Sequence, residues 1–150
     1  MNYLIRHAAE KDTDAVYQFI CLLEENNLDY SNLDYSVFTS VYNKNIAIEN
    51  YIYLVAESGA GTVIGFISCH TQLLLHHCGK VAEIQELYID GKHRNLGIGK
   101  ALLNEVEKRL MLNNCISFEV TAQNKRLQTH QFYENNGFLY SHKKFVKELC

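Results

Sequence analysis

The sequence predicts a single α+β domain in which strands and helices are mixed along the chain. The chain has 150 residues, which is the size of one domain. Its apolar patterns follow one another as a strand, two helices, three strands, a helix, a strand, a helix and a strand. No repeat, low-complexity segment or linker interrupts this order, so residues 1–150 are expected to form one unit.

The N-terminal third is expected to contain one strand and two helices. Residues 4–7 are expected to form a first strand. Asp12 or Thr13 can cap a helix that fades out at residues 24–27. Its apolar residues share one face: Val16, Phe19, Ile20 and Leu23. A second, weaker helical pattern consists of Tyr35, Phe38, Val41 and Tyr42.

The centre of the chain predicts a hairpin followed by another strand. Residues 51–57 and 63–75 have strand character, and the sequence Ser-Gly-Ala-Gly at 58–61 supplies the turn between them. After a second polar turn, residues 81–89 form the next strand. Three consecutive strands are therefore expected here.

The C-terminal third alternates between helices and strands. After a glycine pair, apolar residues recur at the spacing of one helix face: Ala101, Leu102, Leu103, Val106 and Leu110. Residues 115–121 are expected to form a strand, and residues 126–136 a helix that stops at Gly137. Residues 138–147 are expected to form a last strand.

The composition argues against a general nucleic-acid or membrane-surface function. The formal net charge is −3, and no block of Lys or Arg is present. The N-terminus lacks an apolar signal segment, and no apolar run reaches the length of a membrane span, so a cytoplasmic location is expected. Five scattered cysteines without a C-x-x-C pair predict neither a disulfide framework nor a zinc site.

The segment 94–100, Arg-Asn-Leu-Gly-Ile-Gly-Lys, is the strongest local motif of the chain. It lies between an expected strand and an expected helix, where free backbone N–H groups and the positive end of the helix dipole attract anions. Glycine permits a close approach of the backbone, and Arg94 and Lys100 add positive charge, so a diphosphate would fit. An ordinary tight turn is the alternative, because glycine pairs are common in turns.

This motif resembles the acyl-CoA loop of the GCN5-related N-acetyltransferase (GNAT) superfamily. A second segment, 124–138, resembles the Asn and the helix ending in Phe-Tyr-x-x-x-Gly-Phe of the same superfamily. The resemblance implies a twisted, mostly antiparallel sheet with helices on both faces, acetyl-CoA as cosubstrate, and a homodimer as a common oligomeric state. The implied acetyl-CoA contacts are Leu87, Tyr88, Ile89, Arg94, Asn95, Leu96, Gly97, Ile98, Gly99, Lys100 and Asn124.

Acetyl transfer to a primary amine requires a general base, because the amine is almost fully protonated at pH 7. Glu83 occupies the position at which the superfamily often places this base. Glu86 is the rival, or a contact to the substrate amine; by strand alternation it faces away from Glu83 unless a bulge intervenes. Either glutamate could instead be a solvated structural residue. By the same resemblance, Tyr133 is the general acid that protonates the departing thiolate.

The whole chain is also similar to the aminoalkylphosphonate N-acetyltransferases, which implies an acceptor with a primary amine and a phosphonate. Further acceptor contacts are then expected at His70, His77, Arg126 and His142. A divalent metal ion is a further expectation, since imidazoles and carboxylates are metal ligands, but the spacing of the histidines defines no ligand set. The alternatives are a protein or polyamine N-acetyltransferase and a non-catalytic acetyl-CoA sensor.

Overall fold

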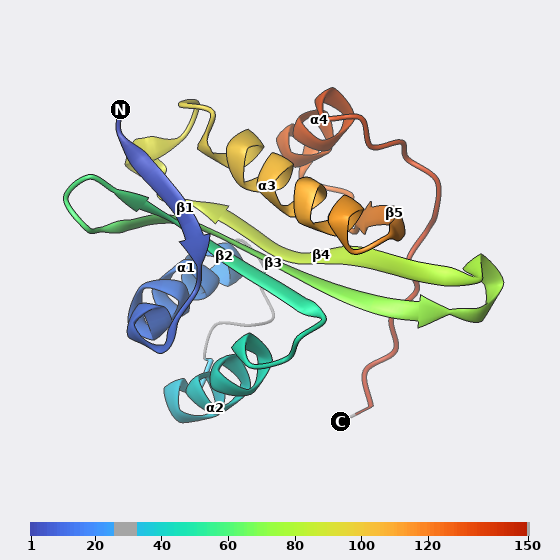
Figure 1. The fold of residues 1–150 in the computed structure, drawn as a ribbon, viewed down its shortest axis with the longest axis horizontal. Helices are drawn as coiled ribbons and strands as arrows, with labels where there is room; N and C mark the ends of the chain where they lie inside the picture. The colour runs from blue at the N-terminus through green and yellow to red at the C-terminus, as the bar shows by residue number, and fades with distance from the viewer. Residues whose placement is uncertain (26–32, 150) are drawn as a thin grey trace.

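The computed structural model describes residues 1–25 and 33–149 (Figure 1). In this part of the chain, five strands form one sheet in the order β1-β2-β3-β4-β5. The strands are β1 (Tyr3–His7), β2 (Tyr51–Ser58), β3 (Val63–Leu74), β4 (Gly79–Ile89) and β5 (Cys115–Val120). All neighbours are antiparallel except β4 and β5, which are parallel. The predicted α+β class and the mostly antiparallel sheet are therefore confirmed.

Two pairs of helices cover the two faces of this sheet (Figure 1). The helices are α1 (Thr13–Glu25), α2 (Tyr35–Ile46), α3 (Ile98–Leu112) and α4 (Leu127–Asn135), with short 3-10 turns η1 (Glu10–Asp12), η2 (Leu75–His77) and η3 (Gly91–His93). None of the helices within the described ranges has both the length and the apolar character needed to cross a membrane.

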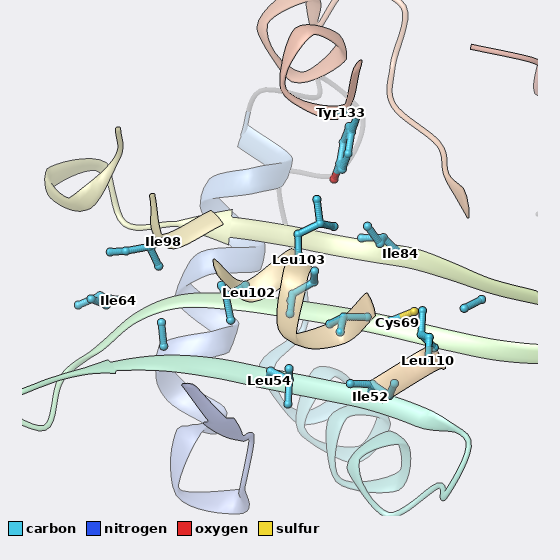
Figure 2. Packing of buried hydrophobic residues seen from close by; sticks show 14 residues of the cluster. Ile52, Leu54, Ile64, Cys69, Ile84, Ile98, Leu102, Leu103, Leu110 and Tyr133 are labelled. Carbon is cyan, nitrogen blue, oxygen red and sulfur yellow. The ribbon is translucent and has the colours of Figure 1, made fainter. Parts of the chain in front are cut away.

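The sheet separates two apolar cores. On one face α3 packs against the strands through Leu102, Leu103 and Val106, with Tyr133 of α4 beside them (Figure 2). On the other face α1 and α2 pack against aromatic side chains of β2 and β3. This second core is smaller: it consists of Val16, Phe19, Tyr42, Tyr53, Val55 and Phe66.

The predicted last strand at residues 138–147 is wrong. Phe138 still packs against Phe118 and Tyr133, with ring centroids 5.2 and 5.4 Å apart. The residues that follow form neither helix nor strand, and most are exposed. A strand requires a hydrogen-bonding partner as well as a suitable sequence, and within the described part of the chain β4 is the only strand that pairs with β5.

Candidate active site

A β-bulge in β4 organises the candidate site. Ser68 lies opposite Glu86, whereas the next residue of β3, Cys69, lies opposite Ile84. Gln85 is therefore the extra residue of the bulge, and the alternation of side chains along β4 changes phase there.

The bulge brings Glu83 and Glu86 to the same face of the sheet. Ile84 and Leu87 both belong to the core under α3, although they are three residues apart. Neighbouring side chains of a strand point to opposite faces of the sheet. Glu83, next to Ile84, and Glu86, next to Leu87, consequently both point to the α1 and α2 side. A bulge was the condition under which Glu86 was expected to share the face of Glu83, and the structure has this bulge.

Cross-strand neighbours surround each glutamate with polar and aromatic groups. His70 lies opposite Glu83 on β3, and Tyr51 of β2 lies opposite His70. The rings of Tyr51 and His70 are stacked, with centroids 3.6 Å apart. Thr121, which follows β5, donates a hydrogen bond of 3.3 Å from Oγ1 to Oε1 of Glu83.

Glu86 is held by Ser68. The Ser68 hydroxyl donates to the Glu86 carboxylate, and the Glu86 backbone N–H donates back to Ser68 Oγ at 3.1 Å. Ser68 is fully buried, so this reciprocal pair fixes the position of the glutamate backbone and side chain.

A hydrogen-bonded chain runs from α2 to β3 beside Glu86. Asn45 Nδ2 donates to Tyr53 Oη at 2.8 Å, and Tyr53 Oη lies 2.9 Å from His70 Nε2. Burial lowers the pKa of His70, which favours the neutral imidazole, and raises the pKa of Tyr53 to about 12. Tyr53 thus keeps its proton beside a neutral His70, and the three side chains hold one another in place.

A cavity of about 350 Å³ lies between α1, α2 and the sheet. Glu86 and Asp34 line it, together with Tyr53 and Asn45. None of the described lining residues is Lys or Arg. The remaining lining residues are mostly apolar: Val16, Ile20, Leu33, Val37, Phe38, Val41, Tyr42 and Phe66. This size and lining are those of a small-molecule site.

The glycine motif forms an open turn at the start of α3. Asn95 and Gly97 have φ angles of 61° and 80°, and Gly97 caps the helix without a side chain. The first intrahelical bond joins the Ala101 N–H to the Gly97 carbonyl at 3.0 Å, so the preceding N–H groups have no acceptor in the helix. A Cβ atom at Gly97 would meet nothing within 4 Å, which leaves the approach to these N–H groups open.

Side chains of the motif are divided between the core and the surface. Ile98 is buried, so only its backbone faces the turn, whereas Leu96 and Lys100 are exposed. Arg94 donates from Nε to the Ile89 carbonyl at 3.1 Å, and its guanidinium carbon lies 5.3 Å from the Tyr88 ring centroid. Arg94 is therefore held at the end of β4 by these two contacts.

The pairing of β4 with β5 ends one residue after Glu83. Their last paired residues are Ile84 and Val120, where β5 ends, while β4 continues to Ile89. Along Leu87, Tyr88 and Ile89, the side of β4 that faces away from β3 consequently has no strand partner in the described chain. We call this unpaired edge of β4 the slot; along the chain it lies between Glu86 and the glycine turn. Asn124 is exposed in the turn that follows β5.

Tyr133 approaches β4 from the opposite face. Its side chain is buried against Phe132 and Phe138, and its hydroxyl oxygen points from α4 towards the sheet (Figure 2). Burial raises the pKa of Tyr133 well above its ordinary value, so the phenol keeps its proton at neutral pH.

Three other predicted acceptor contacts lie apart from the cavity. His77 is in the η2 turn, with Nε2 3.9 Å from Oε1 of Glu119. His142 is exposed in the C-terminal segment, where its Nδ1 lies 2.6 Å from the Ser141 hydroxyl. Arg126 donates to the Leu23 carbonyl at 2.9 Å, which connects the start of α4 to the end of α1.

The predicted histidines do not gather into a metal site in the part of the chain described. No three or more His, Cys, Asp or Glu residues there are arranged to hold a metal ion. His70 alone among the predicted histidines joins the hydrogen-bonded chain beside the cavity.

Sequence reasoning missed several residues of the site, mainly Tyr53, Asn45, Ser68 and Asp34. Tyr51 and Tyr53 alternate along a predicted strand, which indicates a shared aromatic face. That pattern does not say which residues of other elements meet the face, because strand register and helix placement are tertiary properties.

Comparison with known proteins agrees with this geometry. The sequence model of the acetyltransferase (GNAT) family matches residues 18–138. An aminoalkylphosphonate N-acetyltransferase from Salmonella typhimurium is 37% identical over 145 residues, which cover 97% of this chain and 90% of that protein.

Two solved structures show the same fold at low identity. A transcriptional regulator from Bacillus halodurans aligns with a TM-score of 0.87 and 21% identity over 99% of this chain and 100% of its own. An aminoglycoside antibiotic 6'-N-acetyltransferase from Acinetobacter baumannii aligns with a TM-score of 0.82 and 17% identity, with the same coverage of both chains. With its fold, its glycine turn and the match over residues 18–138, the chain belongs to the GNAT family of acetyltransferases.

Proposed function

We propose that this protein transfers an acetyl group from acetyl-CoA to the primary amine of a small aminoalkylphosphonate. The observation that carries the proposal is the 37% identity to an aminoalkylphosphonate N-acetyltransferase over 97% of the chain. The cavity of about 350 Å³ beside the slot supports a small acceptor, because a protein acceptor needs an open groove.

The glycine turn and the slot fit the two parts of acetyl-CoA. The free N–H groups at the start of α3, with Arg94 beside them, suit the pyrophosphate. The unpaired edge of β4 at residues 87–89 suits the amide groups of the pantetheine arm. In this arrangement, the backbone N–H of Leu87 or Tyr88 polarises the thioester carbonyl as an oxyanion site.

Glu83, Glu86 and Tyr133 have separate functions in the proposed reaction. Glu86 contacts the acceptor ammonium in the cavity, and Glu83 takes a proton from it, directly or through water. The amine nitrogen then bonds to the thioester carbonyl carbon, and the carbon–sulfur bond breaks. Tyr133 gives its proton to the departing thiolate, and the second proton of the nitrogen returns to the Tyr133 phenolate, directly or through water. The products are the acetylated amine and free coenzyme A, and the first proton remains on Glu83 until it is released to solvent.

The phosphonate requires positive charge that the described cavity lining does not supply. Arg126 is one candidate, since it donates to the Leu23 carbonyl of α1, a helix that lines the cavity. His70 can contribute a hydrogen bond, and a divalent cation bound together with the phosphonate is the further candidate.

A polyamine is the second candidate acceptor, and one observation favours it. Two acidic side chains, Asp34 and Glu86, line the cavity, and its described lining includes no Lys or Arg. Such a lining attracts an acceptor with two or more ammonium groups.

An acceptor panel tests these proposals in one experiment. Acetyl-CoA consumption is measured with aminomethylphosphonate, 2-aminoethylphosphonate, the matching alkylamines, polyamines and lysine peptides, each with and without EDTA. We expect kcat/KM to be highest for an aminoalkylphosphonate, and a loss with EDTA identifies a required metal. Equal or faster turnover of alkylamines or polyamines would overturn the phosphonate assignment, and acetyl-CoA binding without any turnover would favour a sensor.

Gly97→Val is expected to raise the KM for acetyl-CoA by about tenfold or more, because its side chain would project into the open approach to the turn. Gly61→Val is the matched control, since Gly61 also has a φ of 80° and no neighbour within 4 Å of a built Cβ. Both substitutions strain the backbone, but Gly61 lies in the β2–β3 turn, outside the proposed acetyl-CoA site, so only Gly97→Val should change this KM. Initial rates at varied acetyl-CoA check the difference, and an equal KM in the two variants would remove the turn from the cosubstrate site.

A further inference from the structure

The proposed base, Glu83, lies apart from the cavity in which the acceptor ammonium would bind. Glu86 and Tyr53 line this cavity, whereas Glu83 is not among its described lining residues. Glu83 and Glu86 share one face of the sheet, but their backbones are roughly 7–10 Å apart along β4. A proton that leaves an ammonium beside Glu86 therefore needs a path to Glu83.

Two rows of side chains cross β2, β3 and β4 on this face of the sheet. Opposite residues of the three strands define them: Tyr53, Ser68 and Glu86 in the first row, and Tyr51, His70 and Glu83 in the second. Two members of the first row line the cavity, and no member of the second row is among the described lining residues. The path to Glu83 therefore has to cross from the first row to the second.

A hydrogen bond joins the two rows. Tyr53 Oη lies 2.9 Å from His70 Nε2, so a side chain that lines the cavity also touches an imidazole of the second row. His70 lies directly opposite Glu83, and the Cβ atoms of such pairs are about 4.5–5.5 Å apart. The Tyr51 ring stacks on His70 with centroids 3.6 Å apart, which keeps the imidazole in this position. His70 thus stands between Tyr53 and Glu83.

The ionisation of these groups suits proton transfer in this direction. Burial lowers the pKa of His70, so at neutral pH its imidazole has a nitrogen free to accept a proton. Burial also raises the pKa of Tyr53 to about 12, so the phenol passes a proton on without remaining ionised. Asn45 Nδ2 donates to Tyr53 Oη at 2.8 Å, which leaves the phenol proton for another acceptor. Around His70, Tyr51 and Tyr53 are uncharged, whereas Glu83 is an acid that can hold the proton.

We propose that Tyr53 and His70 relay the proton of the acceptor from the cavity to Glu83. This inference rests on the proposed function and names the path that its proton takes. An N–H bond of the ammonium breaks and this proton bonds to Tyr53 Oη, while the hydroxyl proton of Tyr53 moves to His70 Nε2. The imidazolium then gives its Nδ1 proton to Glu83, directly or through water.

The relay returns to its first state without a further reactant. Glu83 releases its proton to solvent after the acetyl transfer. His70 is partly exposed, so its imidazole exchanges protons with water and regains the tautomer with a free Nε2. The electron pair freed on the acceptor nitrogen forms the bond to the thioester carbonyl carbon.

Tyr53→Phe is expected to lower kcat/KM for the best amine at pH 7 by about 10²-fold or more. The loss should disappear as the pH approaches the pKa of the amine, because free amine then forms without the relay. Tyr17→Phe is the matched control, since the Tyr17 hydroxyl on α1 also donates a hydrogen bond, at 2.8 Å to the Leu33 carbonyl. The control should keep the wild-type pH profile.

His70→Gln separates proton transfer from support of Tyr53. The glutamine amide can hydrogen-bond to Tyr53 Oη, but it takes up no proton in the working pH range. We expect the same pH-dependent loss as in Tyr53→Phe, with a thermal unfolding midpoint close to that of the wild type. Wild-type activity in His70→Gln would show that the imidazole only supports Tyr53 and would overturn the relay.

A double variant tests whether the relay ends at Glu83. Tyr53→Phe combined with Glu83→Gln should be no slower at pH 7 than the slower single variant, because both changes break one path. Losses that multiply would overturn the proposal, and so would a loss in Tyr53→Phe that persists at high pH. Failure of the proposed function looks different: the wild type then acetylates no amine, or Glu83→Gln has no pH-dependent loss, and the relay falls with it.

Discussion

Tyr133→Phe is expected to lower kcat by about 10²- to 10⁴-fold, which is the usual contribution of a general acid or base. The phenol is buried on α4 and points towards β4, and burial raises its pKa, so it is protonated at neutral pH. Without the hydroxyl, the thiolate of coenzyme A would have to leave as an anion or take its proton from water. The KM for acetyl-CoA should change little, because the ring remains in place.

Tyr3→Phe is the control for this substitution. Tyr3 is partly buried against the same core, on β1, at the edge of the sheet furthest from the slot. Saturating rates and thermal unfolding are measured for both variants. If Tyr133→Phe keeps kcat within a factor of two of the wild type, Tyr133 is only a core residue.

Glu83→Gln is expected to lower the rate at pH 7 by about 10²- to 10⁴-fold and to recover as the pH rises. For an acceptor amine with a pKa near 10.4, deprotonation at pH 7 costs about 4.6 kcal/mol of free energy. Each pH unit below that pKa changes the free-base concentration about tenfold, so the variant rate should follow the titration of the amine itself. The wild type should not need this increase if Glu83 is the base that removes the proton.

Glu86→Gln separates the two carboxylates. Glu86 lines the cavity, so its loss should raise mainly the KM of the amine and leave the pH profile in place. Glu107→Gln, on the exposed face of α3, is the control for a change of charge. A pH-rescued profile in Glu86→Gln, with a normal profile in Glu83→Gln, would exchange the two assignments.

Local patterns were sufficient for most elements of the fold. The helix at residues 98–112 has its buried side chains at helical spacing, and Gly97 adopts the positive φ that its residue type suggests. Both signals involve residues close together in the chain. The glycine turn and its place at the start of a helix therefore follow from the amino-acid sequence alone.

Properties that depend on distant residues could not be predicted in the same way. Whether Glu86 shares a face with Glu83 depends on the bulge at Gln85, which arises from the pairing of β4 with β3. The contact between Tyr53 and His70 depends on the register of β2 with β3. Neither register is fixed by the alternation within one strand.

The sequence by itself thus determined the order of the elements up to α4, the class of the fold and the glycine turn at the start of α3, because these follow from short-range periodicity and glycine geometry. Only the tertiary structure decided that α2 completes a cavity, that the two glutamates share one face of the sheet, and that residues 138–149 lack a strand partner within the described chain. The physical reason is that pairing and packing energies belong to two segments at once. A sequence pattern describes each segment alone.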